Sequence, residues 1–275
     1  MMKKILGLFI SLMMASQAFA SIAVAPMRLE INANKIKGNY LTTSVNVTGD
    51  PHKVMRFKVS SGYFTLNDKS ELNIIEEKTQ DPHDLSGKIR FVPSEFNVQP
   101  GKSQRVRLNI INLNQLPDGE SRAILFIEDV DPKEFNLDTG RAGYGAQLIV
   151  KTRLGVPIYL DKGKVSKVGD IEYFKITKEK DGLYTEAKIN STGNSKIRYT
   201  GKVQIIKDKK LIDEYNLTGH PVGHGNHFVT KDKIKTDKIT GAGEYTLRLV
   251  ITYEDGNGKK QNLKQEAVLS IKGEI

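Results

Sequence analysis

Apolar and polar residues alternate along most of the chain, which is the period of a β-strand with one buried face. Clear examples are residues 55–60 (MRFKVS), 88–92 (KIRFV) and 104–111 (QRVRLNII). β-Branched and aromatic residues are frequent in these stretches, and turn sequences such as QPGKS and LPDGE separate them. Since no window carries a long apolar stripe of helical period, the pattern predicts an all-β protein built of sandwiches.

The strand pattern pauses once, at residues 159–170 (YLDKGKVSKVGD), where the chain is charged and contains two glycines. Such a segment has little to bury and is typical of a domain boundary. A second series of strands follows it, of about the length of an immunoglobulin-type domain. We therefore expect two immunoglobulin-like β-sandwich domains in tandem, at residues 21–160 and 161–275.

The first twenty residues have the pattern of a cleaved secretory signal peptide, residues 1–20. Lys3 and Lys4 precede the apolar run 5–14, and small residues end the segment at Ala20. The pattern predicts a secreted chain that starts near Ser21. The sequence contains no cysteine, so a secreted protein of this kind is held together by core burial and carries no thiolate chemistry.

The net charge of +10 is spread along the chain rather than gathered in blocks. A basic protein can bind nucleic acid, anionic lipid or acidic polypeptides, but scattered charge is more typical of a solubilising surface. We therefore expect no nucleic-acid partner.

Catalytic motifs are absent from the sequence, which contains no GxSxG, HExxH, Walker or GxGxxG pattern. Residues 81–84 (DPHD) place two acids beside a histidine, although adjacent residues of a turn point in different directions. His220, His224 and His227 lie in a glycine-rich stretch that offers imidazoles but no fixed geometry for a metal. We expect a protein that is not an enzyme and has neither a cofactor nor a metal site.

Residues 91–110 (FVPSEFNVQPGKSQRVRLNI) resemble a hallmark of the PapD-like periplasmic pilus chaperones. In that family an aromatic strand end, a Pro-Ser step, a short strand, a Pro-Gly turn and a Gln-x-Val-Arg strand come in this order. The matching residues here are Phe91, Pro93, Ser94, Phe96, Pro100, Gly101, Gln104, Val106 and Arg107. Residues 121–130 and 146–160 resemble the last two strands of the family's first domain. The second domain matches more loosely, which is typical of the alternate or archaic branches.

The resemblance implies an L-shaped pair of domains and chaperone work without ATP. A chaperone of this family lends its last first-domain strand to a pilus subunit that lacks a strand, which is β-augmentation. The donor segment would be residues 146–152, with Ala146, Leu148, Val150 and Thr152 on the face that enters the subunit. Ile149 lies on the opposite face. The alternative is an ordinary strand whose Leu148 and Val150 fill their own domain's core.

The resemblance also implies an anchor for the carboxylate at the subunit's C-terminus, made by an arginine of the first strand and a lysine of the last. The arginine matches Arg28, whose guanidinium can bind a carboxylate through two parallel hydrogen bonds. The lysine position is Gly155, which has no charge. Arg153, two residues earlier on the same face, is the candidate replacement, and Lys151 is a poorer one by position. The alternative for Arg28 is a surface charge on an edge strand.

The implied partners are pilus or fimbrial subunits, with an outer-membrane usher that receives the chaperone–subunit complex. A homodimer that caps its own exposed strands is a further expectation, and the implied location is the periplasm. A second hypothesis is a secreted PapD-like or immunoglobulin-like binding protein with a partner unrelated to pili, because a fold does not fix a function.

Overall fold

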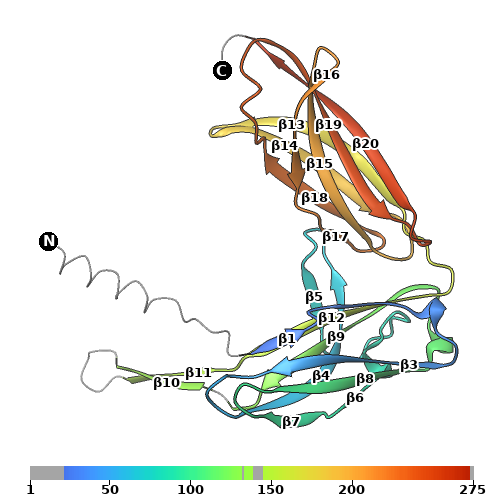
Figure 1. Cartoon of the computed structure of the whole chain (residues 1–275), viewed down its shortest axis with the longest axis vertical. Helices are drawn as coiled ribbons and strands as arrows, with labels where there is room; N and C mark the ends of the chain where they lie inside the picture. The colour runs from blue at the N-terminus through green and yellow to red at the C-terminus, as the bar shows by residue number, and fades with distance from the viewer. Residues whose placement is uncertain (1–21, 132, 139–144, 273–275) are drawn as a thin grey trace.

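The computed structural model describes residues 22–131, 133–138 and 145–272, so the predicted signal peptide lies outside the described residues. Nearly all of the regular structure in these ranges is strand, apart from three short 3-10 helices. None of the helices found there is long and apolar enough to cross a membrane. The strands form two β-sandwiches in tandem, which confirms the predicted all-β class (Figure 1).

The first sandwich packs a four-stranded sheet against a six-stranded sheet. The four-stranded sheet contains, in spatial order, β1 (Ala23–Ala25), β3 (Tyr40–Thr48), β8 (Ser103–Ile111) and β6 (Ile89–Val92). The six-stranded sheet contains β2 (Leu29–Asn32), β12 (Arg153–Lys162), β9 (Gly119–Asp129), β4 (Met55–Leu66) and β5 (Leu72–Ile75), with β7 (Glu95–Val98) paired to β4. The connections contain the 3-10 helices η1 (Ala33–Lys35), η2 (Ser86–Lys88) and η3 (Leu113–Gln115).

The alternation in β8 shows how the sequence produces this core. Val106, Leu108 and Ile110 are fully buried between the two sheets, whereas the arginines between them are exposed. Lys102 N donates to Gln99 O at 3.0 Å in the turn that precedes the strand. Gly101 has a φ of +66° there, a conformation that favours glycine. The turn and strand predicted from residues 99–111 are therefore both present.

The first strand segment joins both sheets of the first sandwich. β1 pairs with β3 in the smaller sheet, and beyond Pro26 the chain crosses over. β2 then pairs in parallel with β12 at the edge of the larger sheet, where Leu29 lies opposite Ile158. Arg28 immediately precedes β2, so this crossing places it on the larger sheet.

The single strand expected over residues 146–160 is in fact two strands, β11 (Gly145–Val150) and β12. β12 pairs with β9 from Arg153 onward, whereas β11 pairs with β10 (Lys133–Asp138). Between them the backbone of Thr152 accepts a hydrogen bond from Asp129 N at 2.9 Å. The ladder with β9 ends at this point, so the chain changes its pairing partner and the strand is interrupted.

The second sandwich packs a three-stranded sheet against a five-stranded sheet. The three-stranded sheet contains β13 (Gly169–Glu179), β14 (Gly182–Ser191) and β18 (Asn226–Lys233). The five-stranded sheet contains β16 (Lys210–Leu217), β15 (Ile197–Lys207), β19 (Gly243–Glu254) and β20 (Lys260–Ile271), with β17 (Pro221–Val222) beside β15. Its core is separate from that of the first sandwich.

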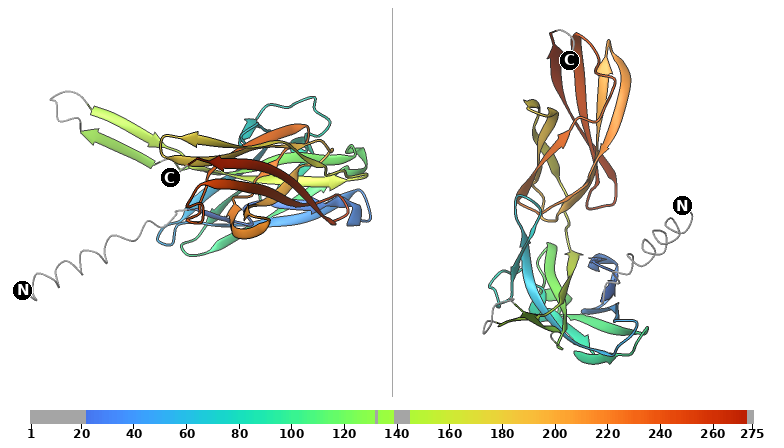
Figure 2. Two further views of the ribbon diagram at one scale, coloured as in Figure 1. Left: turned by 90° about the horizontal axis from the view of Figure 1, so that it is seen from above. Right: turned by 90° about the vertical axis from the view of Figure 1, so that its left-hand side faces the viewer.

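The two sandwiches are joined by residues 163–168, between the end of β12 and the start of β13. Figure 1 shows the second sandwich rising from the face of the first that carries β5 and β12, which gives the molecule a bent outline, and the right panel of Figure 2 shows the same arrangement from the side. The division of the chain at residues 160 and 161 stays a prediction.

Candidate functional site

The predicted donor segment lies mainly in a two-stranded ribbon that leaves the first sandwich. β10 and β11 are antiparallel, with Phe135 opposite Leu148 and Leu137 opposite Ala146. Within the described residues, β11 belongs to no other sheet. Figure 1 and the left panel of Figure 2 show the ribbon extending away from both sandwiches.

Three consecutive aliphatic side chains of β11 are exposed to solvent. The exposed fractions are 48% for Leu148, 54% for Ile149 and 36% for Val150. None of the three belongs to a core cluster, so Leu148 and Val150 do not fill the core of their own domain. Ala146 lies in β11, but its side chain is outside the described residues. Thr152 is half-buried at the base of the ribbon, beyond the end of β11.

Arg28 lies on the outer face of the larger sheet, with its side chain 54% exposed. Its Nε is 3.3 Å from Glu30 Oε1. The exposure leaves the guanidinium accessible to a ligand, although it already faces one carboxylate of its own chain.

Arg153 is also on the outer face, but its charge is engaged. Its two terminal nitrogens donate to the two oxygens of Glu76 at 2.7 and 3.2 Å, and the guanidinium lies 3.6 Å from the centre of the Phe126 ring. The hydrogen bond from Arg153 lowers the pKa of Glu76. Glu128 Oε2 lies 3.9 Å from Arg153 Nε, so acids lie on two sides of this guanidinium.

The structure does not bring Arg28 and Arg153 together on one group. Arg28 precedes Leu29, which is opposite Ile158, whereas Arg153 lies five residues earlier on β12. At roughly 3.3 Å per residue, five residues of strand span about 16 Å. Gly155 lies between these levels, and a Cβ there would be 2.7 Å from Ile124 Cδ1. A side chain at position 155 therefore needs Ile124 to move.

A buried charged cluster, which the sequence reasoning missed, lies where the two sandwiches meet. Glu120 of β9 is fully buried and lies 3.0 Å from Lys196 Nζ of the second sandwich. The ammonium group of Lys196 also lies 3.6 Å from the centre of the Tyr159 ring. The Glu120 carboxylate and burial raise the pKa of Tyr159 to about 12, with burial the larger cause. The ion pair therefore connects the two domains away from solvent.

The same cluster continues through Arg122, which is 6% exposed. Its Nη2 is 3.1 Å from His224 Nε2 and 3.4 Å from the Tyr63 hydroxyl, which in turn donates to Asp81 at 2.6 Å. Burial, followed by the bond to Asp81, raises the pKa of Tyr63 to about 12. Burial and the Arg122 charge lower the pKa of His224. Arg122 is thus the main cation of this part of the interface.

The three loop histidines do not converge on one point. His220 stacks on Phe228 with ring centres 4.4 Å apart, whereas His224 contacts Arg122. His227 donates its backbone N–H to Asn226. Across the described residues, no group of three or more histidine, aspartate or glutamate side chains could hold a metal ion. The histidines therefore contribute to packing and to the domain interface.

The acids of residues 81–84 support the loop in which they lie. Asp84 Oδ1 accepts from the Ser86 hydroxyl at 2.6 Å, and its other oxygen accepts from Thr79. His83 Nδ1 lies 2.9 Å from the backbone oxygen of Glu120. These contacts fix the loop against β9.

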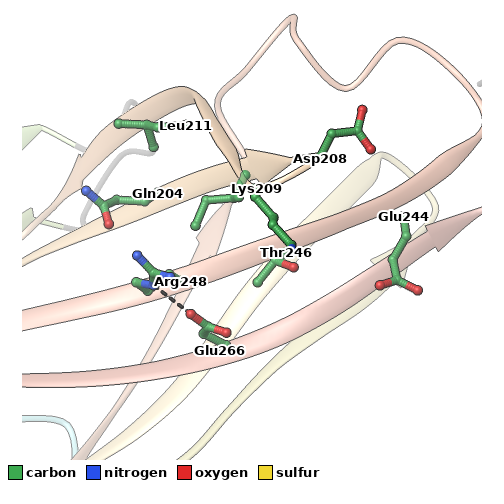
Figure 3. Close-up of a pocket in the computed structure, with 9 residues that line it drawn as sticks. Gln204, Asp208, Lys209, Leu211, Glu244, Thr246, Arg248 and Glu266 are labelled. Atoms are coloured by element: carbon green, nitrogen blue, oxygen red, sulfur yellow. Dashed lines mark hydrogen bonds and ion pairs between the residues drawn. The ribbon is translucent and has the colours of Figure 1, made fainter.

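A separate cleft of about 600 Å³ lies on the second sandwich, lined by residues of β15, β16, β19 and β20 (Figure 3). Arg248 Nε and Glu266 Oε1 form an ion pair across it at 2.6 Å. No residue predicted from the sequence as part of a site lies in this cleft.

Comparison with known proteins finds similarity of structure but not of sequence. No family model matches the chain, and no curated protein matches it. The class 5 fimbriae chaperone CfaA is 14% identical with a TM-score of 0.47, over 89% of this chain and 98% of that chain. A chain of the CsuC–CsuE chaperone–subunit complex of Acinetobacter baumannii is 13% identical with a TM-score of 0.43, over 89% and 98%.

The CupB2 chaperone of Pseudomonas aeruginosa is 12% identical with a TM-score of 0.39, over 88% of this chain and 98% of that chain. At these identities the similarity is one of fold. Over about nine tenths of its length, the chain is similar in its two-sandwich architecture to solved pilus chaperones.

Proposed function

We propose that the protein is a periplasmic chaperone that binds pilus or fimbrial subunits by lending them β11. The observation that carries this proposal is the ribbon, which holds Leu148, Ile149 and Val150 in solvent on a strand that pairs only with β10 in the described chain. The resemblance of residues 91–110 to the family's hallmark supports the same function.

An exposed β-strand can extend the sheet of a partner through its backbone, while its side chains fill pockets. Apolar side chains in solvent gain free energy when a partner covers them. Burial of a whole aliphatic side chain is worth about 1.5–3 kcal/mol, so covering the exposed half of Leu148 contributes about 1 kcal/mol. The same strand would also cover a hydrophobic groove that would otherwise aggregate.

The face that enters the partner would be the one with Leu148 and Val150, together with Ala146 and Thr152. Arg28 would bind a carboxylate of the partner and thereby fix the register of the lent strand. Arg153 can share this task only by leaving Glu76, which it holds with two hydrogen bonds. We therefore assign the anchor first to Arg28.

The remaining parts of the proposal concern the setting. Residues 1–20 would direct the chain to the periplasm and be removed there. The complex with a subunit would be delivered to an outer-membrane usher, and the free protein would pair with a second copy through its exposed strand. The work is that of a binding protein and needs no catalysis.

The test is capture of partners from the periplasm by the tagged protein, followed by reconstitution with the polypeptide that is recovered. Wild type should retain a β-rich fibre subunit, and hydrogen exchange at the β11 amides should slow in the complex. The double change Leu148→Asp and Val150→Asp should abolish retention. Leu211→Asp, at an equally exposed leucine of β16, is the matched control and should not.

All variants should keep the wild-type melting temperature, because the altered side chains are exposed. Ile149→Asp tests the face and should weaken retention less than Leu148→Asp. A partner that binds the double variant as tightly as wild type would contradict the role of β11. A recovered partner unrelated to fibre subunits would instead favour the second hypothesis, a binding protein of another kind.

A further inference from the structure

One carboxylate of the first domain, that of Glu30, faces three cations. Glu30 Oε1 lies 3.3 Å from Arg28 Nε, 3.2 Å from Arg198 Nη2 and 4.0 Å from Lys196 Nζ. Arg28 precedes β2 in the first sandwich, whereas Lys196 and Arg198 belong to the second. Cations of both domains therefore converge on one oxygen, and we call these four residues the Glu30 cluster.

The cluster lines a cleft of about 430 Å³ that contains more basic than acidic side chains. Lys167 and Lys260 line it together with Lys196 and Arg198, and Glu30 is one of two acids in its wall. Glu30 is only half-buried, with 43% of its side chain exposed, so it can swing away without crossing a packed core. Without its carboxylate the cleft would favour an anion.

The chemistry of the cluster matches a carboxylate best. Two guanidinium groups that share one oxygen present planar donors suited to a carboxylate. The first sandwich alone offers no second cation beside Arg28, because β12 has Gly155 there and Arg153 is held by Glu76. Arg198 already reaches the oxygen that Arg28 reaches, and its Nε is buried without a hydrogen-bond partner.

We propose that the Glu30 cluster is a carboxylate-binding site, which Glu30 occupies in the free protein and a carboxylate of the bound polypeptide takes over. Arg198 of the second domain is the second cation of this site. The inference rests on the proposed function for the identity of the occupant, though not for the existence of the site. The carboxylate comes from a chain terminus or from an acidic side chain of the partner.

The existence of the site is tested without any partner. In Glu30→Ala the resident carboxylate is gone, so sodium acetate should cause saturable shifts of the Nε–H signals of Arg28 and Arg198 in NMR spectra. Sodium chloride at the same ionic strength should not. Wild type should respond at least tenfold more weakly, because Glu30 competes. Equal responses to acetate and chloride, or to acetate in both proteins, would overturn the site.

Its use is tested with the polypeptide recovered by capture. Arg198→Ala should weaken binding about tenfold, as expected for loss of a hydrogen bond to a charged group. Glu30→Gln should strengthen binding, and its near-isosteric shape keeps the fold intact. Arg248→Ala removes an ion-paired arginine from the separate cleft of Figure 3 and is the matched control, with binding unchanged within twofold.

An amidated C-terminus on the partner distinguishes the two sources. Loss of the Arg198→Ala effect on amidation assigns the carboxylate to the chain terminus, and persistence assigns it to an acidic side chain. Unchanged affinity of Arg198→Ala for the unmodified partner would overturn the assignment. The change Leu148→Asp with Val150→Asp should abolish partner binding but leave the acetate response, so failure of the strand and failure of the site give different results.

Discussion

Lys196→Met tests how strongly the buried ion pair between the domains contributes to stability. The Glu120 side chain is fully buried and that of Lys196 is 6% exposed, with 3.0 Å between the carboxylate and the ammonium. Removing one partner of such a pair leaves a buried charge and costs about 3–5 kcal/mol. Arg122 Nε remains 3.8 Å from the other oxygen of Glu120, which places the expected loss near about 3 kcal/mol.

For a chain of this length, each kcal/mol corresponds to roughly 2–4 °C, so the melting temperature should fall by about 6–12 °C. Scanning calorimetry and urea unfolding at neutral pH measure the change. Lys202→Met is the matched control, because Lys202 and Glu214 form an ion pair of similar length, 2.9 Å, that is exposed. Its loss should cost less than about 1 kcal/mol.

A double-mutant cycle decides whether the effect belongs to the pair. Glu120→Gln alone should destabilise, and Glu120→Gln combined with Lys196→Met should cost less than the sum of the two single changes, since both charges are then gone. Additive losses, or a Lys196→Met protein as stable as Lys202→Met, would refute the reasoning.

Three further predictions concern packing and pH. Gly155→Ala should lower the free energy of unfolding by about 1 kcal/mol, because the new Cβ meets the Ile124 methyl; in an Ile124→Val background the cost should vanish in urea titrations. The pKa of His224 is below its usual 6.5, so this group's stabilisation is complete above pH 6.5 and falls as the pH drops through that value. Calorimetry from pH 7.5 to 5 should therefore show a smaller loss for His224→Gln than for wild type, and an equal loss would contradict the role of burial beside Arg122. Leu108→Ala, at a fully buried position, should cost about 2–5 kcal/mol, and an unchanged calorimetric trace would contradict the core assignment.

The sandwich cores could be predicted from the sequence because their signal is local. Alternation in residues 104–111 places Val106, Leu108 and Ile110 on one face, and the structure buries all three. The Pro-Gly turn before them has the expected backbone. Each of these features depends on neighbours a few residues away, which a single sequence displays directly.

The interface and the ribbon could not be predicted in the same way. Glu120 and Arg122 are polar residues at alternate positions of a strand, which is also the pattern of a solvated face. Only docking of the second domain buries them, and no spacing in the sequence announces it. The capture of Arg153 by Glu76 likewise depends on the pairing of β5 with β4, so the position of Arg153 near Gly155 in the sequence was a poor guide to its availability.

The crossing of the first strand segment between sheets affects the order in which the first domain can form. β2 is among the first segments to be synthesised, yet its partner β12 is the last strand of the domain. Contacts between segments so far apart in sequence form late and slow the completion of a fold. The edge of β12 therefore stays open until the start of the chain returns to cover it, and during that interval an extended segment of another polypeptide could compete with β2 for the same place.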